Sequence, residues 1–206
     1  LTPGRFYGRL DEIALPAIQV FKEHTGQALR QDCRVWEDSL WLGIPTRPAG
    51  SRINGQPLDA QQVMCRPGGR DFELVTPEGF DIYGVVIRLP ALYDAAERQG
   101  ITLDEQWMIA PRRHVNPATL RALLFLLERL LGQQQGAIAE KLHQDILLTG
   151  LLELLDAQQP CGELPPSYAH RKAVVDRVKQ YVDAHVDTPI TMNALCELTH
   201  VSRRTL

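Results

Sequence analysis

Short apolar runs separated by turns fill the chain from residue 6 to residue 89. The runs at 18–21, 28–36, 40–44, 72–75 and 82–89 have the length of strands. Turns are marked most strongly at Arg66–Arg70 and 76–79, and residues 45–56 read as a loop because they hold several glycine and proline residues. Many short strands with frequent turns predict a β-barrel or jelly roll.

The period changes after Pro90, where leucine begins to recur at helical spacing. We expect a short helix over 92–98, a second beginning at Pro117 after the cap residue Asn116, and a third from about residue 135. Gly132 allows the last two to fold back on each other. Their apolar stripe either closes the barrel or meets a second subunit. We favour the second subunit, because leucine occupies more than one face. The residues expected in that contact are Leu120, Leu124, Leu127, Leu131, Leu142 and Ile146.

The end of the chain has the pattern of a helix-turn-helix. Pro189 or Thr191 can begin a helix that carries Met192, Leu195 and Leu198 on one face. Thr199–Val201 predict a turn, and Ser202 is a good cap for a second helix. Arg203 and Arg204 would then lie in its first turn, where such helices touch DNA.

These elements define an α+β chain in four parts. A cupin-like barrel or jelly roll is expected over 1–90, a helical dimerisation segment over 91–155 and a proline-rich linker over 156–168. The start of an all-α helix-turn-helix domain occupies 169–206. Basic residues outnumber acidic ones from His170 onward, although the whole chain has a net charge of −3. A mildly basic tail is typical of a domain that meets phosphates.

Composition is that of an ordinary globular protein, with 44% hydrophobic and 23% charged residues. No apolar run reaches the roughly 20 residues that span a bilayer. The four cysteines are widely separated and form no zinc-binding spacing, so free thiols in a cytoplasmic protein are expected.

Metal and catalytic chemistry is poorly supported. The strand region contains His24 as its only histidine, in an expected turn, whereas metal-dependent cupins need several histidines inside the barrel. Cys65 has no basic partner nearby in sequence and is expected to be a buried, inert thiol. We therefore expect no catalytic residue, no metal and no required cofactor.

A barrel without metal can still hold a small ligand in an apolar pocket with a few polar groups. The aromatic candidates are Trp36, Trp41, Phe72 and Tyr83, and the polar candidates are Glu37, Arg66 and Glu73. Each of them has a plainer interpretation as a core or surface residue. Trp36, Glu37, Trp41 and Glu73 are the ligand-binding residues that we predict.

Several stretches resemble a known family. Ile190, Leu195, Leu198, His200–Ser202 and Arg204–Leu206 are similar to the start of the DNA-binding domain of AraC-family transcription regulators. Ile18–Phe21, Ala28–Gln31, Trp41–Pro45, Arg66–Gly69 with Phe72–Leu74, and Gly84–Ile87 resemble AraC-family activators of ethanolamine-utilisation operons. Since the chain begins at Leu1 and stops inside the second helix of the motif, we expect it to be a fragment.

The resemblance implies a cytoplasmic, dimeric, effector-sensing transcription activator. Its effector would be a small amine or amino alcohol such as ethanolamine, and adenosylcobalamin is a further implied ligand. A protonated amine would need a carboxylate and an aromatic face, which Glu37, Glu73, Trp36 and Trp41 supply by type. In the intact protein Ser202, Arg203, Arg204 and Thr205 would meet DNA, and RNA polymerase is a possible partner. The alternatives are a metal-free cupin enzyme and a barrel that senses a protein.

Overall fold

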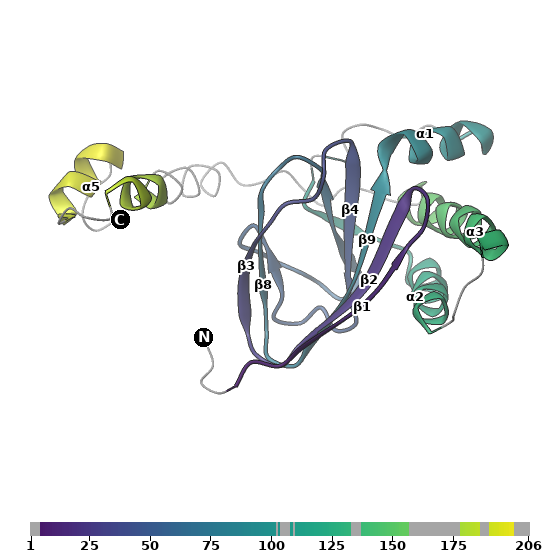
Figure 1. Ribbon diagram of the computed structural model, residues 1–206, viewed down its shortest axis with the longest axis horizontal. Coiled ribbons are helices and arrows are strands. Elements are labelled where there is room, and N and C mark those ends of the chain that lie inside the picture. Colours follow the sequence, from purple (N-terminus) through teal and green to yellow (C-terminus); the bar gives the residue numbers. More distant parts are fainter. Residues whose placement is uncertain are drawn as a thin grey trace. The chain divides into compact units, whose positions relative to one another are not determined.

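The computed structural model describes residues 5–101, 103, 108, 110–132, 137–156, 178–185 and 190–199. The chain divides into two compact units, Leu1–Gly162 and Glu163–Leu206 (Figure 1). The first unit holds every described strand together with the helices α1, α2 and α3. The four-part division expected from the sequence stays a prediction.

The strands of the first unit form two antiparallel sheets. The larger has the order β1-β2-β9-β4-β7-β10 and the smaller has the order β3-β8-β5-β6. The larger sheet contains β1 (Gly8–Ala14), β2 (Ile18–Thr25), β9 (Phe80–Arg88), β4 (Ser39–Pro45), β7 (Gln62–Pro67) and β10 (Arg112–His114). The smaller contains β3 (Leu29–Cys33), β8 (Phe72–Thr76), β5 (Arg52–Ile53) and β6 (Gln56–Pro57).

The larger sheet buries apolar side chains on both of its faces. Side chains alternate along each strand, so Leu40 and Leu42 of β4 point to one face and Trp41 points to the other. The face with Trp41 packs against the smaller sheet through Phe72, Phe80 and the residues around them. This cluster is the interior of the barrel.

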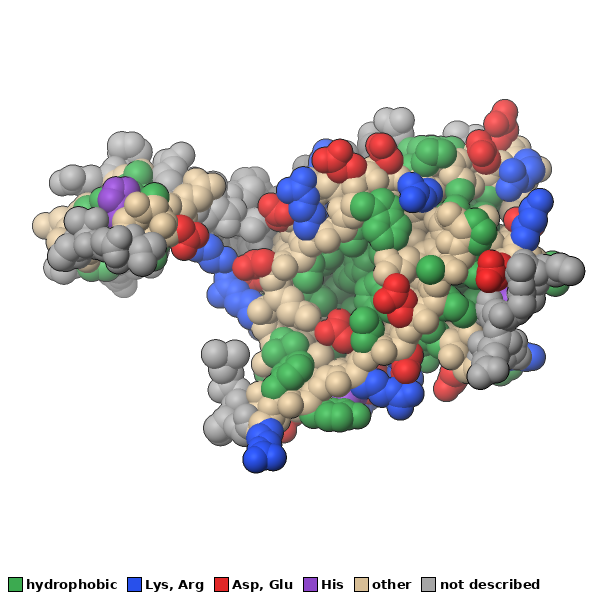
Figure 2. Space-filling view, viewed as in Figure 1, with side chains coloured by type: hydrophobic (Ala, Val, Ile, Leu, Met, Phe, Trp, Pro, Cys, Tyr) green, Lys and Arg blue, Asp and Glu red, His purple; other side chains and the backbone are tan. Residues whose placement is uncertain are grey.

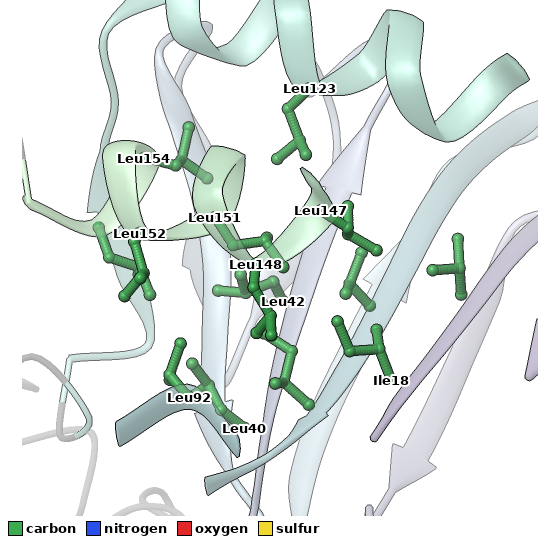
Figure 3. Close-up of a cluster of buried hydrophobic side chains, with 14 of the residues drawn as sticks. Ile18, Leu40, Leu42, Leu92, Leu123, Leu147, Leu148, Leu151, Leu152 and Leu154 are labelled. Atoms are coloured by element: carbon green, nitrogen blue, oxygen red, sulfur yellow. The ribbon is translucent and has the colours of Figure 1, made fainter. Parts of the chain in front are cut away.

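The opposite face of the larger sheet is covered by three helices (Figure 1). They are α1 (Leu89–Arg98), α2 (Pro117–Leu131) and α3 (Ala137–Asp156). Figure 3 shows their leucines pointing into one cluster with Ile18, Leu40 and Leu42 of the strands. Asn116 caps α2 as predicted, since its side chain accepts a hydrogen bond of 2.8 Å from the backbone N–H of Ala118.

The packing of α2 and α3 changes the expected role of the leucine stripe. Leu127 is 0% exposed inside the cluster shared with the sheet, and Leu120, Leu124 and Leu131 are packed against that cluster. Leu127 is therefore a core residue and is not available to a second subunit. Of the predicted contact residues, Leu142 and Ile146 remain exposed, at 60% and 44%. The larger part of the stripe covers the sheet.

Two local predictions were wrong, and one strand was not predicted. Residues 45–56 are not entirely loop, because β5 and the start of β6 lie there, and β10 returns to the larger sheet after α1. Strands of two or three residues are too short to show an alternating pattern. His24 lies in β2 rather than in a turn, where its backbone is aligned with Asp81 of β9.

The second unit contains a helix at 178–184 and α5 (Met192–Thr199). Thr191 begins α5 as predicted, because its Oγ1 accepts a hydrogen bond of 3.2 Å from the N–H of Ala194. Ser202, Arg203, Arg204 and Thr205 lie outside the described residues, as does nearly all of the predicted linker. Among the described helices, none has both the length and the apolar character that crossing a membrane demands.

We predict that Leu127→Ala lowers the free energy of unfolding by about 2–5 kcal/mol, because it leaves a cavity between α2 and the sheet. Leu142→Ala is the matched control and should change it by less than about 0.5 kcal/mol, because that side chain is exposed. Urea titration of both variants measures the difference. Equal effects would contradict the assignment of Leu127 to the core.

Candidate ligand site

A hollow of about 490 Å³ lies on the inner face of β1 and β2. It forms there because the six-stranded sheet has more strands than the four-stranded sheet that faces it, so its β1 end keeps an uncovered inner surface. Figure 2 shows this side of the barrel as an apolar depression with acidic side chains around it. The lining side chains that point inward include Leu10, Glu12, Gln19, Phe21, Glu23 and Thr25.

Two glycines let aromatic rings approach the larger sheet, and one of these rings, Phe21, lines the hollow. Gly43 of β4 lies directly opposite Gly84 of β9, and Gly84 also lies opposite Phe21 of β2. A Cβ atom on Gly84 would lie 2.0 Å from Cζ of Phe21, and one on Gly43 would lie 2.3 Å from Cη2 of Trp41. The rings of Phe21 and Trp41 therefore pack directly against the backbone of Gly84 and Gly43, respectively, with no side chain between them. This close approach requires glycine at both positions.

Two carboxylates stand beside Phe21 on the same inner face. Glu12 lies opposite Phe21 in the β1–β2 register, and Glu23 follows Phe21 by two residues along β2. The Glu12 Oε1 accepts a hydrogen bond of 2.6 Å from Gln19 Nε2, and the Glu23 Oε1 accepts one of 3.3 Å from Gln31 Nε2 of β3. Throughout the part of the chain that the structure describes, no lysine, arginine or histidine forms an ion pair with either carboxylate.

The chemistry of this hollow suits a small cation. Carboxylates held only by neutral amides keep their full negative charge available, and an aromatic face adds attraction for an ammonium group. Thr25 also lines the hollow, and its buried Oγ1 has no hydrogen-bond partner among the described residues. Because that oxygen is buried, it is not an accessible ligand group of the hollow.

A second, more polar hollow of about 360 Å³ lies on the opposite face of β1 and β2. Its charges are already paired: Arg9 with Asp11 at 2.9 Å, and His24 with Asp81 at 3.1 Å. Lys22 lies over the ring of Tyr83 at 5.1 Å from its centroid. Because acids and bases balance here, this hollow offers less to a charged ligand than the inner one does.

The four ligand residues predicted from the sequence do not meet in one place. Trp41 is buried in the barrel, with its ring 4.7 Å from that of Phe72. Trp36 is exposed, and the Glu37 side chain is 82% exposed with its carboxylate 3.9 Å from Arg34. Glu73 alternates with the inward side chains of β8 and pairs on the outer face with Arg30 at 2.5 Å. Of the four, only Trp41 points into the barrel.

The sequence analysis missed Glu12, Gln19, Phe21 and Glu23. Residues 19, 21 and 23 alternate with the buried Ile18 and Val20, so one face of β2 begins with apolar residues and the other has a single aromatic ring between polar groups. That alternation was visible in the sequence. The expected strand 18–21 was too short to include Glu23, and β1 was not predicted at all.

Metal and nucleophile chemistry is not apparent in the described residues. Within them, no three or more His, Cys, Asp or Glu side chains gather in a way that would hold a metal ion. Burial raises the pKa of Cys65 to about 12, so this thiol stays protonated near neutral pH. It has the character of an inert core residue.

No known family model matches this chain. Its fold is similar to that of the AraC-like transcriptional activator CuxR, with a TM-score of 0.53 and 14% identity over 98% of this chain and 73% of that one. ToxT from Vibrio cholerae matches with a TM-score of 0.45 and 10% identity over 99% of this chain and 73% of that one. KdgF from Halomonas sp. matches 39% of this chain and 78% of that one, with a TM-score of 0.31 and 11% identity.

The likeness to CuxR concerns the fold. It extends over nearly the whole chain and includes both the barrel and the helices that follow it. The coarse prediction of a mixed chain, with antiparallel strands followed by helices, is confirmed, and the cupin-like character of the barrel stays a prediction. α5 lies where the sequence predicts the first helix of a helix-turn-helix, and the motif stays a prediction because its turn and second helix lie outside the described residues.

Cys33 provides a chemical test of this geometry. Its pKa is raised to about 11, first by burial and then by the negative charge of Glu23. Glu23→Gln should therefore lower the pKa of Cys33 and speed its alkylation by iodoacetamide at a fixed pH, since the thiolate is the reactive form. A fall of one pKa unit corresponds to about tenfold in thiolate fraction at pH values well below the pKa.

The alkylation rate is measured by mass spectrometry of the peptide that contains Cys33. Glu37→Gln is the control, because it removes the same charge from a side chain that is not a cause of the shift. A rate that is unchanged in Glu23→Gln, or raised equally in both variants, would contradict the proximity of Glu23 and Cys33.

Proposed function

We propose that this protein is a ligand-responsive transcription regulator of the AraC type, and that its barrel binds a small protonated amine on the inner face of β1 and β2. The fold likeness to the AraC-like activator CuxR supports the first part. The observation that carries the second part is the pair of carboxylates, Glu12 and Glu23, beside the ring of Phe21 and without a cationic partner among the described residues.

An amino alcohol such as ethanolamine meets the chemistry of this hollow. Its ammonium group would supply a positive charge between Glu12 and Glu23. It would donate charge-assisted hydrogen bonds to their carboxylates, and such bonds are stronger than those between neutral groups. Its hydroxyl would form a hydrogen bond with the side-chain amide of Gln19, which lines the hollow. The resemblance to activators of ethanolamine-utilisation operons supports the same choice of ligand.

Adenosylcobalamin, the other implied ligand, does not fit this hollow. Pockets of a few hundred cubic ångströms enclose drug-sized ligands, and 490 Å³ is in that range. A cobalamin is far larger, so any binding of it would use a different surface. We therefore restrict the proposal to small amines.

The regulatory output would come from the second unit. In this proposal α5 is the first helix of a helix-turn-helix, and Ser202, Arg203, Arg204 and Thr205 begin the helix that contacts DNA. Ligand binding would act by changing the relative stability of conformations that present this motif differently. Contact with RNA polymerase would make the regulator an activator.

The ligand proposal is tested by calorimetric titration and thermal shift with ethanolamine, and with ethane-1,2-diol as its neutral counterpart. We expect ethanolamine to raise the melting temperature and the diol to have little effect, because only the amine carries the charge that the carboxylates lack. Glu23→Gln should weaken ethanolamine binding about tenfold or more, the usual consequence of losing a charged partner.

Glu37→Gln is the matched control and should bind ethanolamine normally, because Glu37 lies outside the hollow. Equal stabilisation by the diol, or loss of binding in Glu37→Gln but not in Glu23→Gln, would contradict the proposed site. Chemical conversion of the amine during the titration would favour the metal-free enzyme instead.

A further inference from the structure

β1 is the edge strand of the six-stranded sheet, and exposed apolar side chains lie on it and just before it: Phe6 and Leu10 on the inner face and Tyr7 on the opposite face. Phe6, Tyr7 and Leu10 are each about 60% exposed, at 61%, 60% and 59%. An edge strand presents unpaired N–H and C=O groups, and native proteins normally protect such an edge with charge, proline or a covering element. β1 carries three charged residues, Arg9, Asp11 and Glu12, and no described strand pairs with its outer edge, so a partner strand there would have to match these charges.

The direction of the free backbone groups follows from two hydrogen bonds. The C=O of Tyr7 accepts from the N–H of Gly26, and the N–H of Leu15 donates to the C=O of Ile18, both at 2.8 Å. Odd-numbered residues at each end of β1 therefore direct their backbone groups toward β2. In an antiparallel ladder these directions alternate, so Gly8, Leu10 and Glu12 direct theirs to the open edge.

The side chains of β1 are complementary to a second copy of the same strand in one register. Antiparallel pairs centred on Arg9, Asp11 or Glu12 place two like charges directly opposite each other, which is destabilising. A pair centred on Leu10 avoids this. It places Leu10 opposite Leu10 of the second copy and brings each Arg9 opposite an Asp11.

The same register also matches the apolar residues. Tyr7 would lie opposite Ile13 of the second copy, and Phe6 opposite Ala14. Arg9 and Asp11 already share one face of β1, where they pair at 2.9 Å. Across the two-fold axis, two such pairs would form a square of alternating charges. Because every contact occurs twice, the interface is self-complementary and closed.

We propose that two copies of this chain associate through β1, as antiparallel edge strands centred on Leu10, and so join their six-stranded sheets into one. This goes beyond the proposed ligand function and does not depend on it. It also assigns dimerisation to a different surface from the leucine stripe, the larger part of which packs against the core shared with the sheet.

The decisive experiment is a mixing test by analytical ultracentrifugation. Arg9→Asp alone and Asp11→Arg alone should each be monomeric, because each places like charges opposite each other twice. An equimolar mixture should contain heterodimers, because every Asp at 9 or 11 of one chain then faces an Arg of the other. Within each variant chain, residues 9 and 11 carry the same charge. If these two residues acted only on each other inside one chain, mixing the two variants would not restore the dimer.

A second variant keeps the test independent of charge. Leu10→Pro removes an N–H that points to the open edge and none that bonds β2, so it should abolish the dimer and leave the circular dichroism spectrum unchanged. Leu142→Glu on α3 is the control and should leave the dimer intact. A monomeric wild-type protein, a mixture that stays monomeric, or a dimer lost with Leu142→Glu and kept with Leu10→Pro would each overturn the proposal.

Discussion

Strands β4 and β9 lie inside the larger sheet and are buried on both faces, and this burial organises the rest of the first unit. A strand with two buried faces needs an apolar cover on each side. Three helices supply one cover and the smaller sheet supplies the other. The leucines of α2 and α3 have the same explanation, because their side chains cover the apolar face of the sheet against which they pack.

The larger sheet has six strands and the smaller sheet has four. The proposed functional features of the molecule lie at the β1 end of the larger sheet. The four strands of the smaller sheet leave a hollow over the inner face of β1 and β2. The lining of this hollow includes the carboxylates of Glu12 and Glu23 and the amide of Gln19. None of the described strands pairs with the outer edge of β1 either. One geometric mismatch thus leaves both the proposed ligand site and the proposed subunit contact on the same strand.

Most of the fold could be predicted from local patterns. The apolar runs of β2, β4, β8 and β9, the cap at Asn116 and the cap at Thr191 each depend on neighbours in sequence, and each was predicted from them. The candidate site could not be found in the same way. It depends on register: Glu12 reaches Phe21 because β1 pairs with β2, and Phe21 lies flat because Gly84 faces it from a strand that is distant in sequence. The predicted Glu37 and Glu73 were chosen by residue type alone, and the pleat directs Glu73 outward to Arg30.

The central claim is that a small amine binds over Phe21 between Glu12 and Glu23. It is tested most directly by nuclear Overhauser contacts between carbon-13-labelled ethanolamine and the aromatic ring protons of the protein in solution. The account predicts contacts from the ethanolamine methylene protons to the ring of Phe21. Saturable binding with contacts to exposed Trp36 and none to Phe21, or no binding at all, would contradict it.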